Sequence, residues 1–329
     1  MAQQRTDRTR SGGIDLVRVL GVVAVVAGHV WDTRAVAAWL YPWHVPVFFF
    51  LTGLLWKPGR PLREEWTRRW HSLAVPYLAW LALLWPVFAL VLWRQDQLSL
   101  RALAAPLYGG NLATQPFTTF WFVSVLLFVA LLYRALERLP RPALAVAALA
   151  SLVLCALPAA TRALAHSPLA IGSALGCLWC VAAGALAQRH WPRLAPHAVG
   201  LGLGGLLLGF SLVCSGLAAV PNLKSGQFGT PLLTPLAACA VSLALVLLCE
   251  RLVAAAPALD RASQLAAGWA LVVVIAHPVV LWVLRGEPAS ALKFALALVV
   301  PALLAAGLAR MPAARWLAGQ AAPARRARP

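Results

Sequence analysis

Long apolar segments constrain the fold of this chain more than any other feature. Its 329 residues contain repeated blocks of about 16–24 mostly apolar residues, and a helix of about 20 such residues crosses a bilayer. Of all residues, 61% are hydrophobic and only 12% are charged, about half the charged share of a soluble domain. These values exclude a disordered chain, a fibrous chain and an ordinary soluble enzyme. The sequence therefore predicts a polytopic membrane protein.

Ten apolar segments are predicted to cross the membrane as helices, so the expected fold is an all-α membrane helix bundle. Their approximate bounds are 14–31, 38–56, 73–93, 119–136, 143–158, 169–187, 198–220, 232–252, 265–284 and 291–309. No soluble domain and no internal repeat is evident. The expected organisation is an N-terminal segment 1–13, a membrane domain 14–309 and a basic tail 310–329.

Basic residues are distributed unequally between alternate loops of this predicted topology. With the N-terminus inside, the inner segments hold 20 Lys and Arg and the outer ones 7, while Arg18 lies within a span. Because cytoplasmic loops carry an excess of basic residues, both termini are predicted to be cytoplasmic, in the cell (inner) membrane. The net charge of +18 is spread between apolar blocks and is not clustered on one soluble face. It therefore indicates contact with membrane lipids and no nucleic-acid partner.

Two patterns that can carry a function are better explained by packing. The small-xxx-small pairs Gly200/Gly204 and Gly205/Gly209 follow no strand, so we expect close helix packing and no dinucleotide site. The Cys-x-x-Cys motif that begins at Cys177 has no second pair or His partner, so packing is expected there too. All six cysteines lie in apolar blocks, which argues against a disulfide framework.

The stretch from Arg94 to Thr118 is more polar than its neighbours and contains Gly109-Gly110-Asn111. Polar, glycine-containing backbone at membrane depth is tolerated where it is buried in protein or lines a cavity. We therefore predict an outer loop that dips into the protein and shapes a pocket.

The first predicted span contains ionisable side chains, which in membranes are functional candidates. Arg18 and His29 are eleven residues apart, so they share a helix face with an offset of about 20° and a separation of about 16 Å along the axis. Asp15 lies three residues before Arg18. For either residue alone, snorkelling of Arg18 and capping by His29 are sufficient explanations. Their common face favours a polar channel, with Arg18 towards the cytoplasm and His29 towards the outer leaflet.

Two further histidines belong to predicted spans. His44 lies in a Tyr-Pro-Trp-His segment that fits an interfacial aromatic belt. His277 lies in the middle of the ninth span and precedes Pro278, which frees a backbone carbonyl. Although a buried His is often only a hydrogen-bonded core residue, one in lipid must face protein or water, so His277 is a pocket candidate. No carboxylate at ligand spacing accompanies His29, His44 and His277, so no metal site is predicted.

The segment 57–71 is rich in Arg and Trp, and residues 62–71 fit an amphipathic helix on the inner surface. Anchoring on anionic lipid is sufficient to explain it. The sharper hypothesis is a docking site for a phosphorylated cytoplasmic cofactor, because guanidinium groups bind phosphate bidentately. The candidates are Arg63, Arg68 and Arg69.

Histidine and arginine on one face are also suited to acyl transfer. A His that titrates near neutrality can remove a proton from a hydroxyl as that hydroxyl attacks a thioester. An Arg beside it can hold a phosphate or carbonyl oxygen and stabilise developing charge. These residues do not by themselves identify the acyl donor.

The motifs, taken in order, resemble the acyltransferase 3 family of membrane O-acyltransferases. The matching elements are Asp15-Leu-Val-Arg18 with ten residues before His29, the phenylalanine-rich segment 45–53, Arg68-Arg69 followed by Val75-Pro76-Tyr77, Phe120-Trp121-Phe122-Val123, and Ala276-His277-Pro278. They extend over nearly the whole chain, and the Arg-x10-His pairing is the most specific. One departure is Thr52, where the family pattern leads us to expect Ser, although the hydroxyl is retained.

The resemblance implies a ten-helix domain that takes an acyl group, commonly acetyl, from cytoplasmic acyl-CoA. The acceptor would be a hydroxyl of a carbohydrate, a glycolipid or a secondary metabolite. It further implies that His29 is the catalytic base, that Arg18 assists it, and that Arg18 and the Arg68-Arg69 pair bind the donor. Acyl-CoA is then a co-substrate, and no cofactor is expected to stay bound. The remaining candidates are Arg63 beside the donor and, for the substrate pocket, Asp15, His44, Thr52, Trp121 and His277.

Two other classes of protein stay open at this point. The first is a transporter or flippase with an intramembrane Arg and His path. Proton-driven transporters usually need intramembrane carboxylates, and Asp15 and Glu250 both lie near the ends of predicted spans. The second is a non-catalytic, acyltransferase-like scaffold that binds lipid or coenzyme A.

Overall fold

The computed structural model describes residues 11–312 and 314–319 of the chain. Within those residues the fold consists of α-helices and short 3₁₀ and π segments, and β pairing is limited to one isolated bridge between Asn222 and Gln227. The prediction of an all-α fold is therefore confirmed. Most of the predicted N-terminal segment 1–13 and half of the predicted basic tail 310–329 lie outside the described residues.

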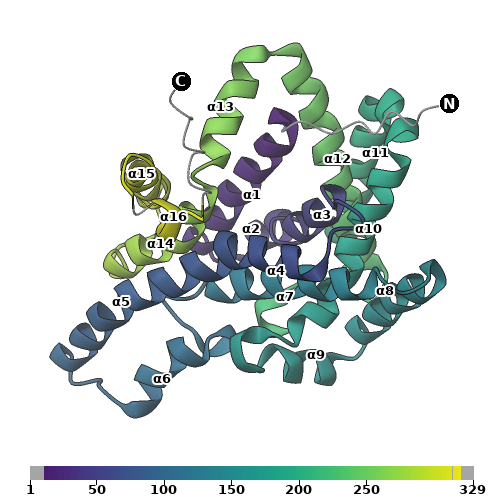
Figure 1. Ribbon diagram of the computed structural model, residues 1–329. Coiled ribbons are helices and arrows are strands. Elements are labelled where there is room, and N and C mark those ends of the chain that lie inside the picture. Colours follow the sequence, from purple (N-terminus) through teal and green to yellow (C-terminus); the bar gives the residue numbers. More distant parts are fainter. Residues whose placement is uncertain (1–10, 313, 320–329) are drawn as a thin grey trace, which may run out of the picture.

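Among the described residues, sixteen α-helices follow one another along the chain (Figure 1). The first nine are α1 (Gly12–Val30), α2 (Arg34–Leu40), α3 (Pro46–Leu54), α4 (Leu62–Arg69), α5 (Val75–Arg94), α6 (Leu100–Tyr108), α7 (Phe120–Leu136), α8 (Arg141–Cys155) and α9 (Pro158–Ala165). The others are α10 (Ser173–Leu194), α11 (Ala198–Cys214), α12 (Leu233–Ala255), α13 (Pro257–Ala267), α14 (Ala270–Val283), α15 (Ala291–Leu308) and α16 (Ala314–Leu317). A π-helical turn, Trp70–Ala74, joins α4 to α5.

Several of these helices have the length and apolarity of membrane spans. In the part of the chain that the structure describes, five helical runs qualify: Gly12–Val30, Leu62–Arg94, Pro168–Cys214, Leu233–Ala255 and Ala291–Leu308. The pair α8 and α9 is bent by 98° and the pair α13 and α14 by 59°, and the total rises to seven if each bent pair is one span. The protein is thus a multi-pass helical membrane protein, while the count of ten spans and the cytoplasmic side of the termini remain predictions.

The second predicted span, 38–56, is not one helix. α2 ends at Leu40, a turn follows, and α3 begins at Pro46, which suits the first turn of a helix because proline lacks an N–H. The nine residues of α3 extend only about 14 Å, too short to cross a bilayer. The prediction of a single span was wrong here because it followed the apolar content of residues 38–56, whereas Pro42 and Pro46 interrupt the helix at this turn.

α3 packs against α10 with the two backbones in direct contact. A Cβ atom added to Gly53 would lie 1.8 Å from the carbonyl oxygen of Val181, and one added to Gly184 would lie 1.9 Å from that of Phe50. No larger residue fits such an approach, which is how small residues bring membrane helices together. The contact carries the phenylalanine-rich helix into the middle of the bundle.

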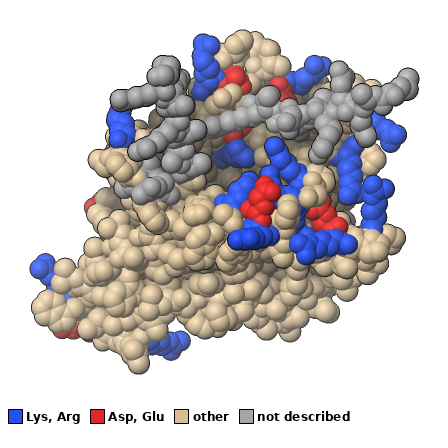
Figure 2. All heavy atoms as spheres, viewed as in Figure 1, with Lys and Arg blue, Asp and Glu red and all other residues tan. Residues whose placement is uncertain are grey.

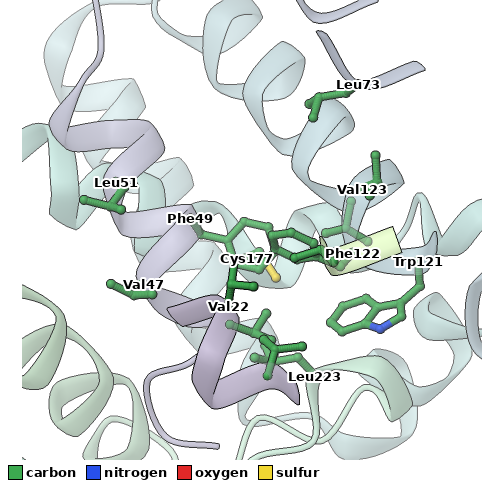
Figure 3. Close-up of a cluster of buried hydrophobic side chains, with 14 of the residues drawn as sticks. Val22, Val47, Phe49, Leu51, Leu73, Trp121, Phe122, Val123, Cys177 and Leu223 are labelled. Carbon is green, nitrogen blue, oxygen red and sulfur yellow. The ribbon is translucent and has the colours of Figure 1, made fainter. Parts of the chain in front are cut away.

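A buried apolar cluster joins α1, α3, α7 and α10 (Figure 3). Val22, Phe49 and Phe122 contribute to it from the first three of these helices and Cys177 from α10. Cys177 and Cys180 are each 1% exposed, and the six cysteines of the chain are free thiols. Both residues of the Cys-x-x-Cys motif therefore pack in the core.

The glycines of α11 pack against α12 at only one of the two predicted pairs. A Cβ at Gly205 would lie 2.9 Å from a carbonyl oxygen of α12, and one at Gly209 would lie 2.4 Å from a side chain of α12. At Gly200 and Gly204 an added Cβ would meet no atom within 4 Å. The prediction holds for the second pair and was wrong for the first, because glycine spacing does not say which face of a helix meets a neighbour.

Candidate active site

A cavity of about 140 Å³ lies at the His29 end of α1, bounded by α3, α7, α14 and the segment between α11 and α12. Apolar rings, among them Phe48 and Phe122, form part of its wall. The polar side chains that line it are His29, Tyr41, His44, Thr119, Asn222 and Lys224. A water molecule occupies about 30 Å³ of liquid, so this volume admits several waters or a small acyl group.

His29 of α1 contacts His277 of α14 inside the protein. Nδ1 of His29 lies 2.8 Å from Nε2 of His277, and the two rings stack with centroids 5.1 Å apart at an interplanar angle of 21°. His277 is fully buried, and its Nδ1 lies 2.9 Å from the carbonyl oxygen of Val273. His277 does not line the cavity, whereas His29 does. The two histidines therefore form a pair with one member facing the cavity and the other behind it.

Pro278 leaves a backbone carbonyl oxygen of α14 free next to this pair. Because proline has no N–H, the carbonyl oxygen of Val274 lacks its usual helical donor, as expected from the sequence. Thr119 fills that place, donating its hydroxyl to this oxygen at 2.8 Å. The bond ties the start of α7 to α14 across the cavity wall. Sequence analysis missed Thr119, because nothing in the sequence pairs it with a residue 155 positions away.

His44 lies in the turn between α2 and α3 and lines the cavity together with Trp121. Its Nδ1 is 2.8 Å from the carbonyl oxygen of Leu40, and its ring packs against that of Tyr41 with centroids 4.8 Å apart. The break in the second predicted span is what turns His44 inward. The structure thus brings three predicted site residues, His29, His44 and Trp121, to one cavity.

Lys224 lies in a short 3₁₀ segment, Leu223–Ser225, and was not predicted as a site residue. Its ammonium donates to the carbonyl oxygen of Ala113 at 2.7 Å and to the hydroxyl of Thr118 at 2.8 Å. Burial lowers the pKa of Lys224 to about 8. In the sequence it resembles an ordinary loop lysine. The feature of the sequence that could have indicated its role is the polar stretch 94–118, which was predicted to shape a pocket. Both hydrogen-bond acceptors of Lys224 belong to this stretch.

Arg18 lies at the opposite end of α1 from His29. Its Nη1 is 2.5 Å from Oδ1 of Asp15, which is buried, while the Arg18 side chain is 35% exposed. Arg18 does not line the His29 cavity. Between the two residues Phe48 covers α1 at Gly21, where an added Cβ would lie 2.8 Å from the Phe48 ring. Arg18 and His29 thus do not line one cavity in this structure.

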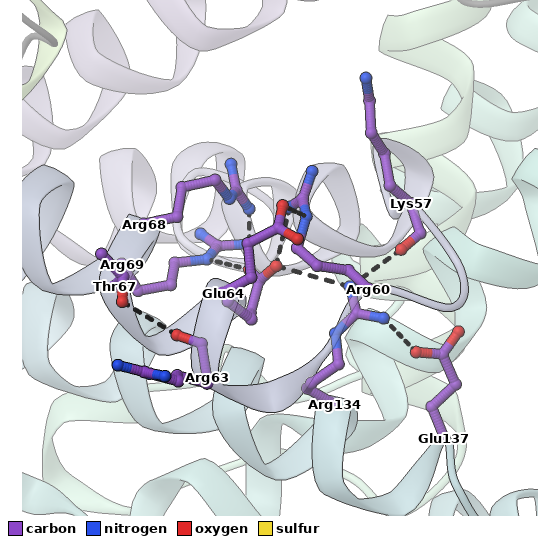
Figure 4. Close-up of polar contacts among 10 residues, drawn as sticks. Lys57, Arg60, Arg63, Glu64, Thr67, Arg68, Arg69, Arg134 and Glu137 are labelled. Atoms are coloured by element: carbon purple, nitrogen blue, oxygen red, sulfur yellow. Dashed lines mark hydrogen bonds and ion pairs between the residues drawn. The ribbon is translucent and has the colours of Figure 1, made fainter.

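The carboxylate of Glu65 in α4 is the centre of a cluster of guanidinium groups from α4, α7 and the segment just before α4; Figure 4 labels these arginines. It accepts hydrogen bonds from Arg68 at 2.7 Å and from Arg60 and Arg69 at 2.8 Å each, and Arg134 lies at 3.5 Å. The Glu65 side chain is 0% exposed. We refer to Glu65 with these four arginines as the Glu65 cluster. Glu65 was not predicted as a site residue, because an acidic residue in a basic amphipathic helix is usually exposed to solvent.

The three predicted donor-binding arginines of α4 differ in how open they are. The Arg69 side chain is 12% exposed and its Nε is bound to Glu65, so Arg69 serves the cluster. The Arg68 side chain is 50% exposed. Arg63 is exposed, and in Figure 4 its side chain points away from those of Arg60 and Arg134. Arg63 and Arg68 therefore keep guanidinium surface that an anion can reach.

Arg134 anchors the Glu65 cluster to α7. Its side chain is 1% exposed, its guanidinium lies over the ring of Trp56 at 4.0 Å from the centroid, and it pairs with Glu137. It also donates to the carbonyl oxygen of Lys57 at 2.9 Å. These contacts fasten the segment that leads into α4. The buried arginine is thus part of the scaffold that orients the exposed ones.

Charge is unevenly spread over the molecular surface. Figure 2 shows Lys and Arg gathered with Asp and Glu over the upper part of the face in view, above a nearly uncharged band. The Glu65 cluster belongs to the segment 57–71, which the sequence analysis assigns to the cytoplasmic side. The His29 cavity is lined instead by segments that the same topology assigns to the outer side.

Thr52 is the remaining predicted site residue. The hydroxyl of Thr52 donates to the carbonyl oxygen of Phe48 at 2.9 Å within α3, and Thr52 does not line the cavity. In residues 11–312 and 314–319, no group of three or more His, Cys, Asp or Glu side chains is arranged to hold a metal ion.

The family model for an acyltransferase domain, Acyl_transf_3, matches residues 11–310 of the 329-residue chain. Searches among curated proteins and among solved structures found no match. The matched stretch contains α1 to α15, and with them the His29 cavity and the Glu65 cluster. Because the match extends over nearly the whole chain, the protein belongs to the acyltransferase 3 family of membrane acyltransferases.

Proposed function

We propose that the protein transfers an acyl group, expected to be acetyl, from cytoplasmic acyl-CoA to a hydroxyl of a carbohydrate, a glycolipid or a small secondary metabolite. The observation that carries this proposal is the placement of His29. Its ring lines a cavity, its Nδ1 is engaged by His277, and its Nε2 has no hydrogen-bond partner among the described residues. A ring held in this way offers one nitrogen to a substrate hydroxyl.

In this proposal His29 is the general base. Its Nε2 takes the hydroxyl proton while the hydroxyl oxygen forms a bond to the thioester carbonyl carbon. The carbon–sulfur bond then breaks, and the imidazolium returns the proton to the departing thiolate. The products are an ester and the free thiol of coenzyme A, so no proton is gained or lost.

Lys224 is suited to stabilise the oxyanion that forms during this attack. An ammonium group has three N–H donors, and the contacts with Ala113 and Thr118 use two of them. A preorganised donor aimed at developing negative charge lowers the barrier of acyl transfer. We propose that the third N–H of Lys224 serves the carbonyl oxygen of the thioester.

The donor enters from the end of the molecule that carries the Glu65 cluster. Arg68 and Arg63 have exposed guanidinium groups, which bind phosphate bidentately, and Arg18 gives a further contact at the same end of α1. The rings of Phe48 and Phe122, whose centroids are 5.3 Å apart, both line the cavity. We propose that the thioester enters past these rings. The small cavity favours a short acyl group.

The test is the replacement His29→Gln in the full chain, purified in detergent and supplied with radiolabelled acetyl-CoA and a panel of sugar glycosides. Loss of a general base lowers turnover by about 10²–10⁴-fold, and we expect the KM for the thioester to change little. The matched control is His190→Gln, because His190 is an exposed histidine of α10. Wild-type turnover in His29→Gln would exclude the base role.

A further inference from the structure

The hydrogen bonds of His277 define which of its nitrogens carries a proton. Nδ1 lies 2.9 Å from the carbonyl oxygen of Val273, and Nε2 lies 2.8 Å from Nδ1 of His29. A carbonyl oxygen only accepts hydrogen bonds, so Nδ1 of His277 must be the donor of this bond.

The second hydrogen bond then has only one direction. His277 is 0% exposed, and the contacts of its ring are a carbonyl and another histidine, so a resting positive charge there is costly and the ring is neutral. A neutral ring with its proton on Nδ1 carries a lone pair on Nε2. His29 must therefore donate from its own Nδ1, and a neutral His29 then has its lone pair on Nε2.

We propose that His277 is a positioning residue that holds His29 in the Nδ1–H tautomer and so presents a basic Nε2 to the cavity. This proposal rests on the proposed function of the cavity. The two roles cannot be exchanged, because His29 lines the cavity and His277 lies behind it without access.

The tautomer matters because neutral histidine in water favours the proton on Nε2. In that form the nitrogen nearest the substrate would donate a hydrogen bond and could not accept the hydroxyl proton. When His29 becomes an imidazolium, its bond to His277 becomes charge-assisted and therefore stronger. In Ser-His-Asp triads, replacing the orienting group leaves the wrong tautomer and costs about 10⁴-fold in kcat. For a neutral orienting ring we expect a loss of about 10²-fold.

The matched pair of variants His277→Gln and His277→Met tests this role. The two side chains have similar length and volume, but the Gln amide offers a strong acceptor to His29 and the Met thioether offers only a weak one. The full-length protein is reconstituted in lipid nanodiscs with isotope-labelled histidine ring nitrogens. NMR then reports the protonation of each ring nitrogen, and the His29→Gln variant assigns the His29 signal among the seven histidines.

The wild-type spectrum should show His29 protonated on Nδ1 and unprotonated on Nε2, and His277→Gln should keep this tautomer. In His277→Met the proton should move to Nε2, and kcat should fall about 10²-fold while the KM for acetyl-CoA changes less than about 2-fold. In His277→Gln, kcat should stay within about 10-fold of the wild-type value.

An Nε2–H tautomer of His29 in the wild-type protein would overturn the assignment, as would an unchanged tautomer in His277→Met. The spectrum does not depend on activity. If the wild-type protein shows the Nδ1–H tautomer and transfers no acyl group, the proposed function fails and the positioning role stands. If His277→Met does not fold, the wild-type and His277→Gln spectra still decide the question.

Discussion

The two ends of the molecule hold polar groups in opposite ways. In the Glu65 cluster, four guanidinium groups lie within 3.5 Å of the oxygens of one buried carboxylate. At the His29 cavity the two histidines share one hydrogen bond, and the Nε2 of His29 remains without a partner among the described residues. At the charged end the buried polar groups are bound to one another, whereas at the cavity end a largely enclosed histidine nitrogen has no protein partner in the described part of the chain.

This difference separates residues that hold the fold from residues that act on a ligand. A buried charge whose partners are removed destabilises the protein, because the remaining charges stay buried and uncompensated. A cavity group that has no structural partner can be replaced with little effect on folding and a large effect on activity. Variants at the two ends should therefore change different measured quantities.

The largest effect on stability is expected for Glu65→Gln. It removes the one negative charge at the centre of the cluster and leaves the guanidinium groups to repel one another, at a cost of about 3–5 kcal/mol. Thermal unfolding in detergent should show a clear fall in Tm. Glu64→Gln is the control, since the Glu64 side chain is 61% exposed and an exposed ion pair contributes about 0–1 kcal/mol. Equal Tm values for the two variants would show that the cluster does not hold α4.

Replacement of Lys224 should affect the rate and its pH dependence. Lys224→Met is expected to lower kcat about 10²–10³-fold by removing an oxyanion donor. Burial lowers the pKa of Lys224 to about 8, so the ammonium loses its charge as the pH rises through this value. The wild-type kcat should accordingly fall above about pH 8, and Lys224→Met should lack this fall. The same pH profile in the wild type and in Lys224→Met would contradict a catalytic role of Lys224.

Arg68→Ala and Arg69→Ala should differ in the quantity that they change. The half-exposed Arg68 is proposed to contact the donor, and its loss should raise the KM for acetyl-CoA about 3–10-fold with little change in Tm. The largely buried Arg69 is bound to Glu65, so its loss should lower Tm instead. An unchanged KM in Arg68→Ala would place the donor phosphates elsewhere.

The smallest effect is expected for Thr52→Ala. The hydroxyl of Thr52 is already bonded to the carbonyl oxygen of Phe48 within the same helix, which also has its backbone donor. We expect kcat/KM within about 2-fold of wild type and a loss of stability of at most about 1 kcal/mol. A large loss of activity would mean that Thr52 faces the substrate in another conformation of α3.

Much of the fold could be read from the sequence because lipid imposes simple rules. Apolar blocks indicated helices, and Pro278 indicated a freed carbonyl in α14. The break at Pro42–Val45 was missed, because the prediction followed the apolar content of residues 38–56 and not the two prolines, Pro42 and Pro46, that mark the turn. That break places His44 at the cavity, so this predicted pocket residue reaches the site through a turn that was not predicted.

The candidate site was predictable where it depends on helix periodicity and not where it depends on tertiary contacts. His29 and Arg18 share a face of α1, yet that geometry did not show that Phe48 lies between them over Gly21. The partnership of His29 with His277 joins residues 248 positions apart, and Lys224 is held by acceptors more than 100 positions away. Only packing of the whole bundle creates these contacts.

The most direct test of this division between the two ends is to measure from which side of the membrane the protein uses acetyl-CoA. Sealed membrane vesicles of known orientation, containing the wild-type protein and supplied with an acceptor glycoside on both sides of the membrane, would receive radiolabelled acetyl-CoA only in the external medium. Vesicles with the cytoplasmic face outward should release coenzyme A thiol, and vesicles of the opposite orientation should do so only after permeabilisation, with His29→Gln as the blank in both. Donor use by intact vesicles of the opposite orientation would contradict the account.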